Sequence, residues 1–226
     1  MTFHARDSCV CRPMFFIMEW IDKVNRIVVL NLLHREDRLL DFTKQAEEYQ
    51  IPFDRINAIH DKQAGARGLR DTMLNLFKEE IAKGTEHLLV FEDDAELVTE
   101  SHIFHTTMNK VVEQVPENYH MVFLGCQITA NGCKWFSENL IRVVKAFSTH
   151  AVLYSLQGMK EVASRDFGYP IDNWYVAELQ NAGHSYCTYP FLASQRDGVS
   201  DIGGNFISWK PFLEQRFKQK FGEIRR

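Results

Sequence analysis

Short apolar runs alternate with amphipathic stretches through the first half of the chain. The runs over 26–32, 88–91 and 121–125 have the length and residue types of buried strands. Between the runs, apolar side chains recur at helical spacing. The pattern predicts strands over 26–32, 55–59, 88–91 and 121–125, and helices over 39–49, 69–81 and 103–115.

This alternation predicts an α/β fold with a mainly parallel, Rossmann-like sheet and helices on both faces. Beyond residue 125 the pattern is less regular. We expect one domain over 25–209, preceded by an appendage over 1–24 and followed by a basic helix over 210–226. Within the second half we expect strands over 140–144, 150–154 and 186–189, helices over 157–164 and 174–180, and loops over 127–139, 166–172 and 195–205.

Three consecutive carboxylates, Glu92-Asp93-Asp94, follow the apolar run 88–91 directly. At the end of a buried strand such acids repel one another and lose hydration, unless a cation or a sugar hydroxyl compensates. Oxygen ligands at this spacing suit Mg²⁺ or Mn²⁺ with positions left open for phosphate. The alternative is an acidic, solvated turn that leads into a helix N-terminus, where acids are also favoured.

A basic turn follows the first strand in the same way. Arg35 and Arg38 can face one side of a helix start, and a guanidinium can bind a phosphate with two hydrogen bonds. The alternative is a surface pair that is bridged to Glu36 or Asp37. Asn31 ends the strand and could bind a base or a ribose, or simply cap the turn. Both turns should lie at the carboxyl edge of the sheet, where ligands bind in such folds.

Composition limits the other function classes. Over 226 residues the net charge is −4, which gives no general attraction to nucleic acid. The five cysteines lack the paired spacing of a zinc site, and we expect reduced thiols in a cytoplasmic protein. The apolar run 14–18 is too short to span a bilayer and carries no signal-peptide cleavage pattern.

With these motifs in view, the chain resembles glycosyltransferase family 25, which includes lipooligosaccharide and procollagen galactosyltransferases. The resemblance runs from about residue 27 to residue 202. It rests on the order and spacing of several short pieces: Val29-Leu30-Asn31-Leu32 with Arg35 and Arg38, Ile51-Pro52-Phe53, Glu92-Asp93-Asp94, Ser148-Thr149-His150-Ala151, Pro170-Ile171-Asp172, and Gln195 with Asp201.

The resemblance implies a GT-A-type fold, a UDP-sugar donor, Mn²⁺ or Mg²⁺, and an inverting transfer. It assigns Asp94 and Glu92 to the metal, while Glu92 and Asp93 are also candidates for contacts with the donor. One departure is evident. Where the family usually has a Cys and then a Ser-His pair, this chain has Leu69, Thr72 and Met73.

Further site residues follow from the same resemblance. Asp172 is the candidate general base, because an inverting transfer needs a carboxylate that removes the proton of the acceptor hydroxyl. Its alternative role is the N-cap of a helix that begins near Asn173. His150, Gln195 and Asp201 are candidate donor contacts. Their alternatives are a buried structural histidine and an ordinary surface loop.

The leading hypothesis is therefore a glycosyltransferase that moves galactose or glucose from a UDP-sugar to a glycan, lipid-linked or protein hydroxyl. A nucleotidyltransferase or phosphatase would need further metal carboxylates. A degenerate GT-A domain that only binds nucleotide sugar or glycan is the non-enzymatic alternative. The amphipathic basic stripe of 210–226 either packs on its own domain, which we favour, or contacts an anionic membrane.

Overall fold

The computed structural model describes residues 18–128, 133–165, 168, 170–199, 201 and 204–208. Cys9, Cys11 and the helix expected over 210–226 lie outside this part of the chain. The helical elements are α1 (Glu19–Lys23), α2 (Glu36–Glu48), α3 (Gly65–Lys83), α4 (Ser101–Gln114), α5 (Leu156–Ala163) and α6 (Ile171–Trp174), with α6 continued by a π-helix (Tyr175–Leu179) and a 3₁₀ turn (Gln180–Ala182).

The central sheet has eight strands in the order β2-β1-β3-β10-β5-β11-β8-β7. The strands β10 and β8 run against their neighbours, so the sheet is mixed but largely parallel. Its strands are β1 (Arg26–Asn31), β2 (Asp54–Asn57), β3 (His87–Glu92), β5 (Met121–Phe123), β7 (Lys134–Trp135), β8 (Leu140–Arg142), β10 (Ala151–Ser155) and β11 (Ser185–Thr188).

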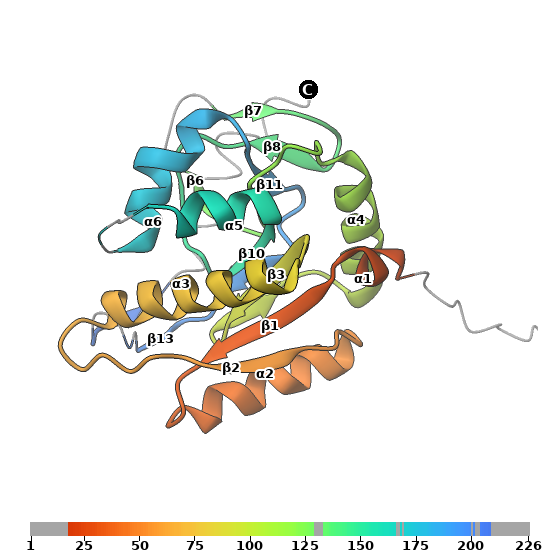
Figure 1. The fold of residues 1–226 in the computed structure, drawn as a ribbon. Helices are drawn as coiled ribbons and strands as arrows, with labels where there is room; N and C mark the ends of the chain where they lie inside the picture. Colours follow the sequence, from red (N-terminus) through yellow and green to blue (C-terminus); the bar gives the residue numbers. More distant parts are fainter. Residues whose placement is uncertain are drawn as a thin grey trace, which may run out of the picture.

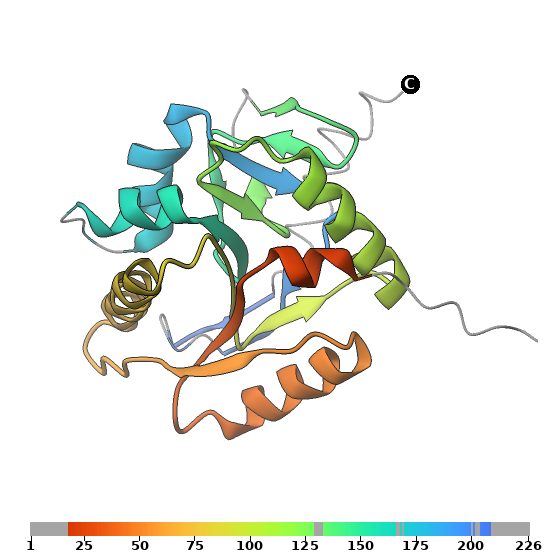
Figure 2. The same ribbon diagram turned by 45° about the vertical axis from the view of Figure 1, so that its right-hand side comes forward.

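Helices cover both faces of this sheet (Figure 1). Successive side chains of β1 point to opposite layers, so Ile27 and Val29 pack with α1, α2 and α4, while Val28 and Leu30 pack with α3 and α5. Figure 2 shows α3, α5 and α6 together on the left of the molecule and α4 on the right. The predicted α/β class is confirmed. The apolar runs that form β1, β3 and β5 are largely buried, whereas β2, at the edge of the sheet, is exposed or half-buried.

Two expectations need correction. The acidic triplet does not lead into a helix: Asp93 and Asp94 form a turn to β4 (Ala95–Leu97), so helix capping does not explain these acids. Residues 18–24 are not an appendage, because Trp20 is fully buried and its indole N–H donates to His105 Nδ1 at 2.9 Å. The apolar pair Trp20-Ile21 between Glu19 and Asp22 was the signal that α1 packs on α4.

The segment expected as a loop over 195–205 begins inside a strand. The strand β12 (Ala193–Gln195) pairs with β4, which places Gln195 opposite Ala95, beside the acidic turn. The backbone at the start of β12 passes close to Gly125: a Cβ added to Gly125 would lie 1.9 Å from the Ala193 carbonyl oxygen. Two further pairs of short strands complete this region and its surroundings: β6 (Gln127–Ile128) with β9 (Ala146–Phe147), and β13 (Gly198–Val199) with β14 (Phe206–Ile207).

Candidate functional site

A cleft of about 650 Å³, open to solvent, lies at the carboxyl ends of β1, β2 and β3. The basic turn after β1, the loop after β2, the acidic turn after β3 and the end of β12 all reach it. Six of the candidate site residues line it. The full set of lining residues is Leu30, Leu32, Arg38, Ala58, Ile59, His60, Asp61, Gly65, Leu69, Glu92, Asp93, Asp94, Gln195 and Asp201.

Asp93 is the buried anchor of the acidic turn, with 7% of its surface exposed. Its carboxylate accepts hydrogen bonds from Asn31 Nδ2 at 2.7 Å and from Arg38 Nη1 at 3.0 Å. Burial nevertheless raises the pKa of Asp93, although both partners act in the opposite direction. Asn31 also donates to the Arg35 carbonyl at 2.9 Å, so one amide joins the basic turn to the acidic turn.

Asp94 offers the cleft an unsatisfied oxygen. Its Oδ2 accepts from Gln195 Nε2 at 3.1 Å and lies 3.5 Å from Arg38 Nη1. Its Oδ1 is buried and has no partner among the described residues. Burial raises the pKa of Asp94, and the hydrogen bond from Gln195 partly offsets this. Because a buried carboxylate oxygen is costly without a partner, Oδ1 marks a position for a cation or a donor.

Glu92 directs its carboxylate toward Thr149, whose Oγ1 donates to it at 2.7 Å. Burial raises the pKa of Glu92 to about 8, and the negative charges of Asp94, Asp93 and Asp172 add to this effect. These effects favour the protonated, neutral form of Glu92 in the free protein. Burial thus raises the pKa of all three acids of the turn.

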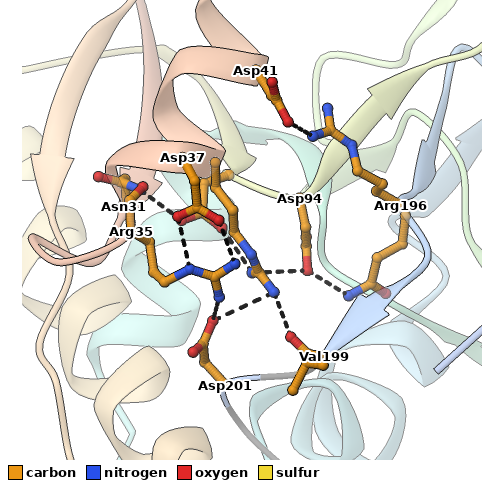
Figure 3. Close-up of polar contacts among 11 residues, drawn as sticks. Asn31, Arg35, Asp37, Asp41, Asp94, Arg196, Val199 and Asp201 are labelled. Carbon is orange, nitrogen blue, oxygen red and sulfur yellow. Dashed lines mark hydrogen bonds and ion pairs between the residues drawn. The ribbon is translucent and has the colours of Figure 1, made fainter. Parts of the chain in front are cut away.

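The two arginines converge on Asp201 (Figure 3). The Arg35 guanidinium binds both carboxylate oxygens of Asp37 at 3.0 Å and also donates to Asp201 Oδ2. Arg38 Nη2 donates to the Val199 carbonyl at 2.7 Å and lies 3.4 Å from Asp201 Oδ2. Arg35 thus has the ion pair with Asp37 that the surface-pair alternative required, together with a second carboxylate at the cleft.

The residues fit a divalent ion only in part. Asp94 Oδ1 is a hard oxygen ligand in the right place. Among residues 18–128, 133–165 and the other described positions, however, no group of three His, Cys, Asp or Glu side chains could hold a metal ion. An ion here would take one or two protein oxygens and complete its shell with phosphate oxygens and water.

Four predicted residues do not line the cleft. Asn31 and Arg35 are bonded to two residues that do, Asp93 and Asp201. The other two are His150 and Asp172. The His150 side chain is fully buried, and burial lowers its pKa to about 4, an effect that the backbone of Ala193 partly offsets. It occupies the position of a structural histidine, which was the alternative to a donor contact. Asp172 is half-buried, and burial raises its pKa, while backbone hydrogen bonds from Asn173 and Ser148 act against this.

The N-cap interpretation of Asp172 is wrong. The helix α6 begins at Ile171 with Pro170 as its N-cap, so Asp172 lies within the first turn. Its charge contributes to the raised pKa of Glu92, so Asp172 lies close enough to interact with Glu92 electrostatically.

The loop after β2 forms one wall of the cleft, and the sequence patterns did not predict this. Thr72 Oγ1 accepts from the Ile59 N–H at 2.8 Å and donates to the Gly68 carbonyl at 2.7 Å, which fixes this loop on α3. Gly68 is needed there, because a Cβ would lie 2.4 Å from the Ile59 carbonyl oxygen. The signal for this wall was the pairing of the strands: β2 is parallel to β1, so the loop after β2 starts at the same edge of the sheet as the turn after β1.

Comparisons with known proteins give similarities of fold at low sequence identity. No protein-family model matches the chain, and no curated protein matches it. A197 from STIV is similar with a TM-score of 0.46 and 13% identity, over 80% of this chain and 93% of that chain. Mannose-1-phosphate geranyltransferase from Thermus thermophilus is similar with a TM-score of 0.41 and 10% identity, over 71% of this chain and 58% of that chain.

A third solved structure is CMP:2-keto-3-deoxy-manno-octonic acid synthetase complexed with CTP. It has a TM-score of 0.35 and 9% identity, and the match covers 72% of this chain and 87% of that chain. These matches do not define a family for the chain. The functional argument therefore rests on the cleft.

Two further expectations concern the protein as a whole. In the part of the chain that the structure describes, Cys126 and Cys187 are buried free thiols. None of the described helices has both the length and the apolar character that crossing a bilayer requires.

Proposed function

We propose that this chain is an inverting, metal-dependent glycosyltransferase that moves galactose or glucose from a UDP-sugar to a hydroxyl of a glycan, lipid-linked sugar or protein. One observation carries the proposal. A buried oxygen without a partner among the described residues, Asp94 Oδ1, lies in a cleft that Arg38 also lines, and Arg35 adjoins Arg38 through their shared contact with Asp201. The divalent ion of a nucleoside diphosphate would give this oxygen a partner, and the phosphates would bind the arginines.

Arg35 and Arg38 bind the phosphates in this proposal, and Asn31 keeps the two turns in register through its bonds to Asp93 and the Arg35 carbonyl. Gln195 and Asp93 orient Asp94 and Arg38. Mn²⁺ or Mg²⁺ at Asp94, with Glu92 as the second candidate ligand, supplies charge neutralisation for the leaving diphosphate. The wall made by His60 and Leu69 is left for the base, ribose or sugar.

Asp172 is the proposed general base. The acceptor oxygen forms the new bond to C1 of the sugar, its proton passes to Asp172, and the bond from C1 to the diphosphate breaks with inversion. The raised pKa of Asp172 improves its proton affinity, because burial disfavours its charged form. The resemblance to family 25, together with the position of Asp172 near Glu92, supports this role.

A second candidate function is the binding of a nucleotide sugar without transfer. The departure at Leu69, Thr72 and Met73 favours it, because Thr72 is a buried support for the loop and Met73 is a core residue with 4% exposure. Contact of residues 210–226 with an anionic membrane, in a cytoplasmic protein with lipid-linked acceptors, is a proposal from the sequence alone.

The experiment is a panel of UDP-sugars tested for stabilisation of the protein against heat, with and without Mn²⁺, followed by an assay for donor turnover. Ligands that bind only the folded state raise its stability. Stabilisation with turnover supports the transferase, and stabilisation without turnover of any donor supports the binding protein. No stabilisation by any nucleotide or sugar nucleotide contradicts both.

A further inference from the structure

The arginine pair of the cleft is already occupied by a carboxylate of the protein. Asp201 Oδ2 accepts from Arg35 Nη1 and lies 3.4 Å from Arg38 Nη2. The two guanidinium groups come from the turn after β1, whereas Asp201 comes from the far end of the chain. Figure 3 shows Asp201 directly below the Arg35 guanidinium, with Val199 to its right. A single oxygen thus takes the central position between both cations.

The remaining contacts of the arginines differ from this one. Asp37 holds Arg35 from outside the cleft, and its side chain is 67% exposed. Asp93, the other partner of Arg38, has only 9% of its side chain exposed and is bound by Asn31. Asp201 is the partner that lines the cleft, with 31% of its side chain exposed. It is therefore the carboxylate that a ligand can replace with the least loss of buried contacts.

A phosphate group has the same requirements as this carboxylate. It needs charged N–H donors that converge on an oxygen, and a diphosphate has enough oxygens to bind both arginines with good geometry. In the free protein such a ligand would have to break the contacts of Asp201 first. Its apparent affinity is then reduced by the fraction of molecules in which the arginines are occupied.

We propose that Asp201 is a built-in competitor for the diphosphate: it occupies Arg35 and Arg38 in the free protein and is displaced when the ligand binds. The inference rests on the proposed function, and it gives Asp201 a role different from that of a donor contact. The two roles predict different changes in ligand affinity when the Asp201 carboxylate is removed. Removing a competitor strengthens the binding of the anion, whereas removing a donor contact weakens the binding of the donor or leaves that of the isolated diphosphate unchanged.

The test is a calorimetric titration with inorganic pyrophosphate in the absence of divalent ions, so that neither sugar nor metal contacts contribute. Asp201→Asn should bind about 2- to 10-fold more tightly than the wild type, the range expected when an exposed ion pair no longer competes. Asp201→Ser should show a similar gain in affinity, which would exclude the asparagine amide as the cause of the gain in Asp201→Asn. Thermal unfolding of each variant confirms that it is folded.

Asp41→Asn is the matched control. It removes the same charge from an ion pair with Arg196 on the same side of the molecule, without touching the arginine pair. Its affinity should stay within about 2-fold of the wild type, since surface charges are screened over about 10 Å at about 0.1 M salt. Figure 3 shows Asp41 and Arg196 apart from Arg35.

Binding of pyrophosphate to the wild type, with no gain in Asp201→Asn and Asp201→Ser beyond that of Asp41→Asn, overturns the inference and leaves the proposed function in place. Weaker binding in both Asp201 variants overturns it as well. Absence of binding in all four proteins contradicts the proposed function together with the inference, because the arginine pair then takes no diphosphate.

Discussion

Replacing Gly125 by alanine should destabilise the protein and disturb the cleft, because the chain passes too close to this position for any side chain. The new Cβ would lie 1.9 Å from the Ala193 carbonyl oxygen, and the backbone around Ala193 must move by about 1 Å or more to relieve the overlap. That movement breaks the bonds by which the Leu192 and Ala193 N–H groups reach the Leu124 carbonyl, at 2.7 and 3.1 Å.

Two lost backbone hydrogen bonds at about 0.5–1.5 kcal/mol each, with about 1–3 kcal/mol for overpacking, give a loss of about 2–6 kcal/mol in the free energy of unfolding. Urea unfolding followed by circular dichroism measures it. The same shift of β12 should displace Gln195 from Asp94 and weaken UDP binding, which is measured calorimetrically under conditions where the variant is folded.

Gly158→Ala is the steric control, since its Cβ would lie 2.0 Å from the His120 carbonyl oxygen, far from the cleft. It should lose stability and keep its affinity for UDP. Gly198→Ala, where nothing lies within 4 Å of the added atom, should change stability by no more than about 0.5 kcal/mol. A loss below about 1 kcal/mol in Gly125→Ala would refute the close approach of β12 to Gly125.

Three further substitutions test the roles of individual side chains. Glu92 has a pKa of about 8 in the folded protein against an ordinary value of 4.5, so the folded state keeps a proton that the unfolded state releases, and stability falls as the pH rises between these values. Glu92→Gln should remove up to about 1.4 kcal/mol of this loss per pH unit, in urea unfolding with a chelator present; an unchanged pH dependence would contradict the raised pKa. Arg35→Ala should weaken UDP binding by about 1.5–3 kcal/mol. Arg35→Lys should recover part of this loss, because an ammonium cannot bind a phosphate with two parallel hydrogen bonds. Unchanged affinity in Arg35→Ala would mean that Arg35 is a surface residue that only pairs with Asp37. Asp172→Asn should keep the donor affinity and lower the transfer rate by about 10²- to 10⁴-fold, and a transfer rate like that of the wild type rejects the assignment as base.

Local patterns predicted much of the fold, because a short apolar run between polar segments is typical of a buried strand. Residues 88–91 are apolar throughout because helices cover both faces of this strand. A run of this length is typical of a strand and too short for a buried helix. The position of the acidic turn followed from the end of that strand. The basic turn followed in the same way from the end of β1, because parallel neighbours end at one edge.

Long-range pairing could not be predicted from these runs. The strand β10 is inserted antiparallel between β3 and β5, although its residues are apolar like those of a parallel strand. The return of Ala193–Gln195 to β4 depends on Gly125, which in the sequence is one glycine after a strand. Side-chain direction is a further limit: Glu92, Asp93 and Asp94 are consecutive, yet their carboxylates bind Thr149, Asn31 and Gln195 respectively.

The central claim is that a nucleoside diphosphate and a divalent ion share this cleft through Asp94. Titration of UDP into the protein, with Mn²⁺ and separately with a chelator, tests it most directly in three proteins: wild type, Asp94→Asn and the control Asp41→Asn. We expect Mn²⁺ to strengthen UDP binding to the wild type and to Asp41→Asn, and we expect Asp94→Asn to be folded but to gain nothing from the ion. Equal affinity of the wild type for UDP with Mn²⁺ and with chelator would contradict the claim.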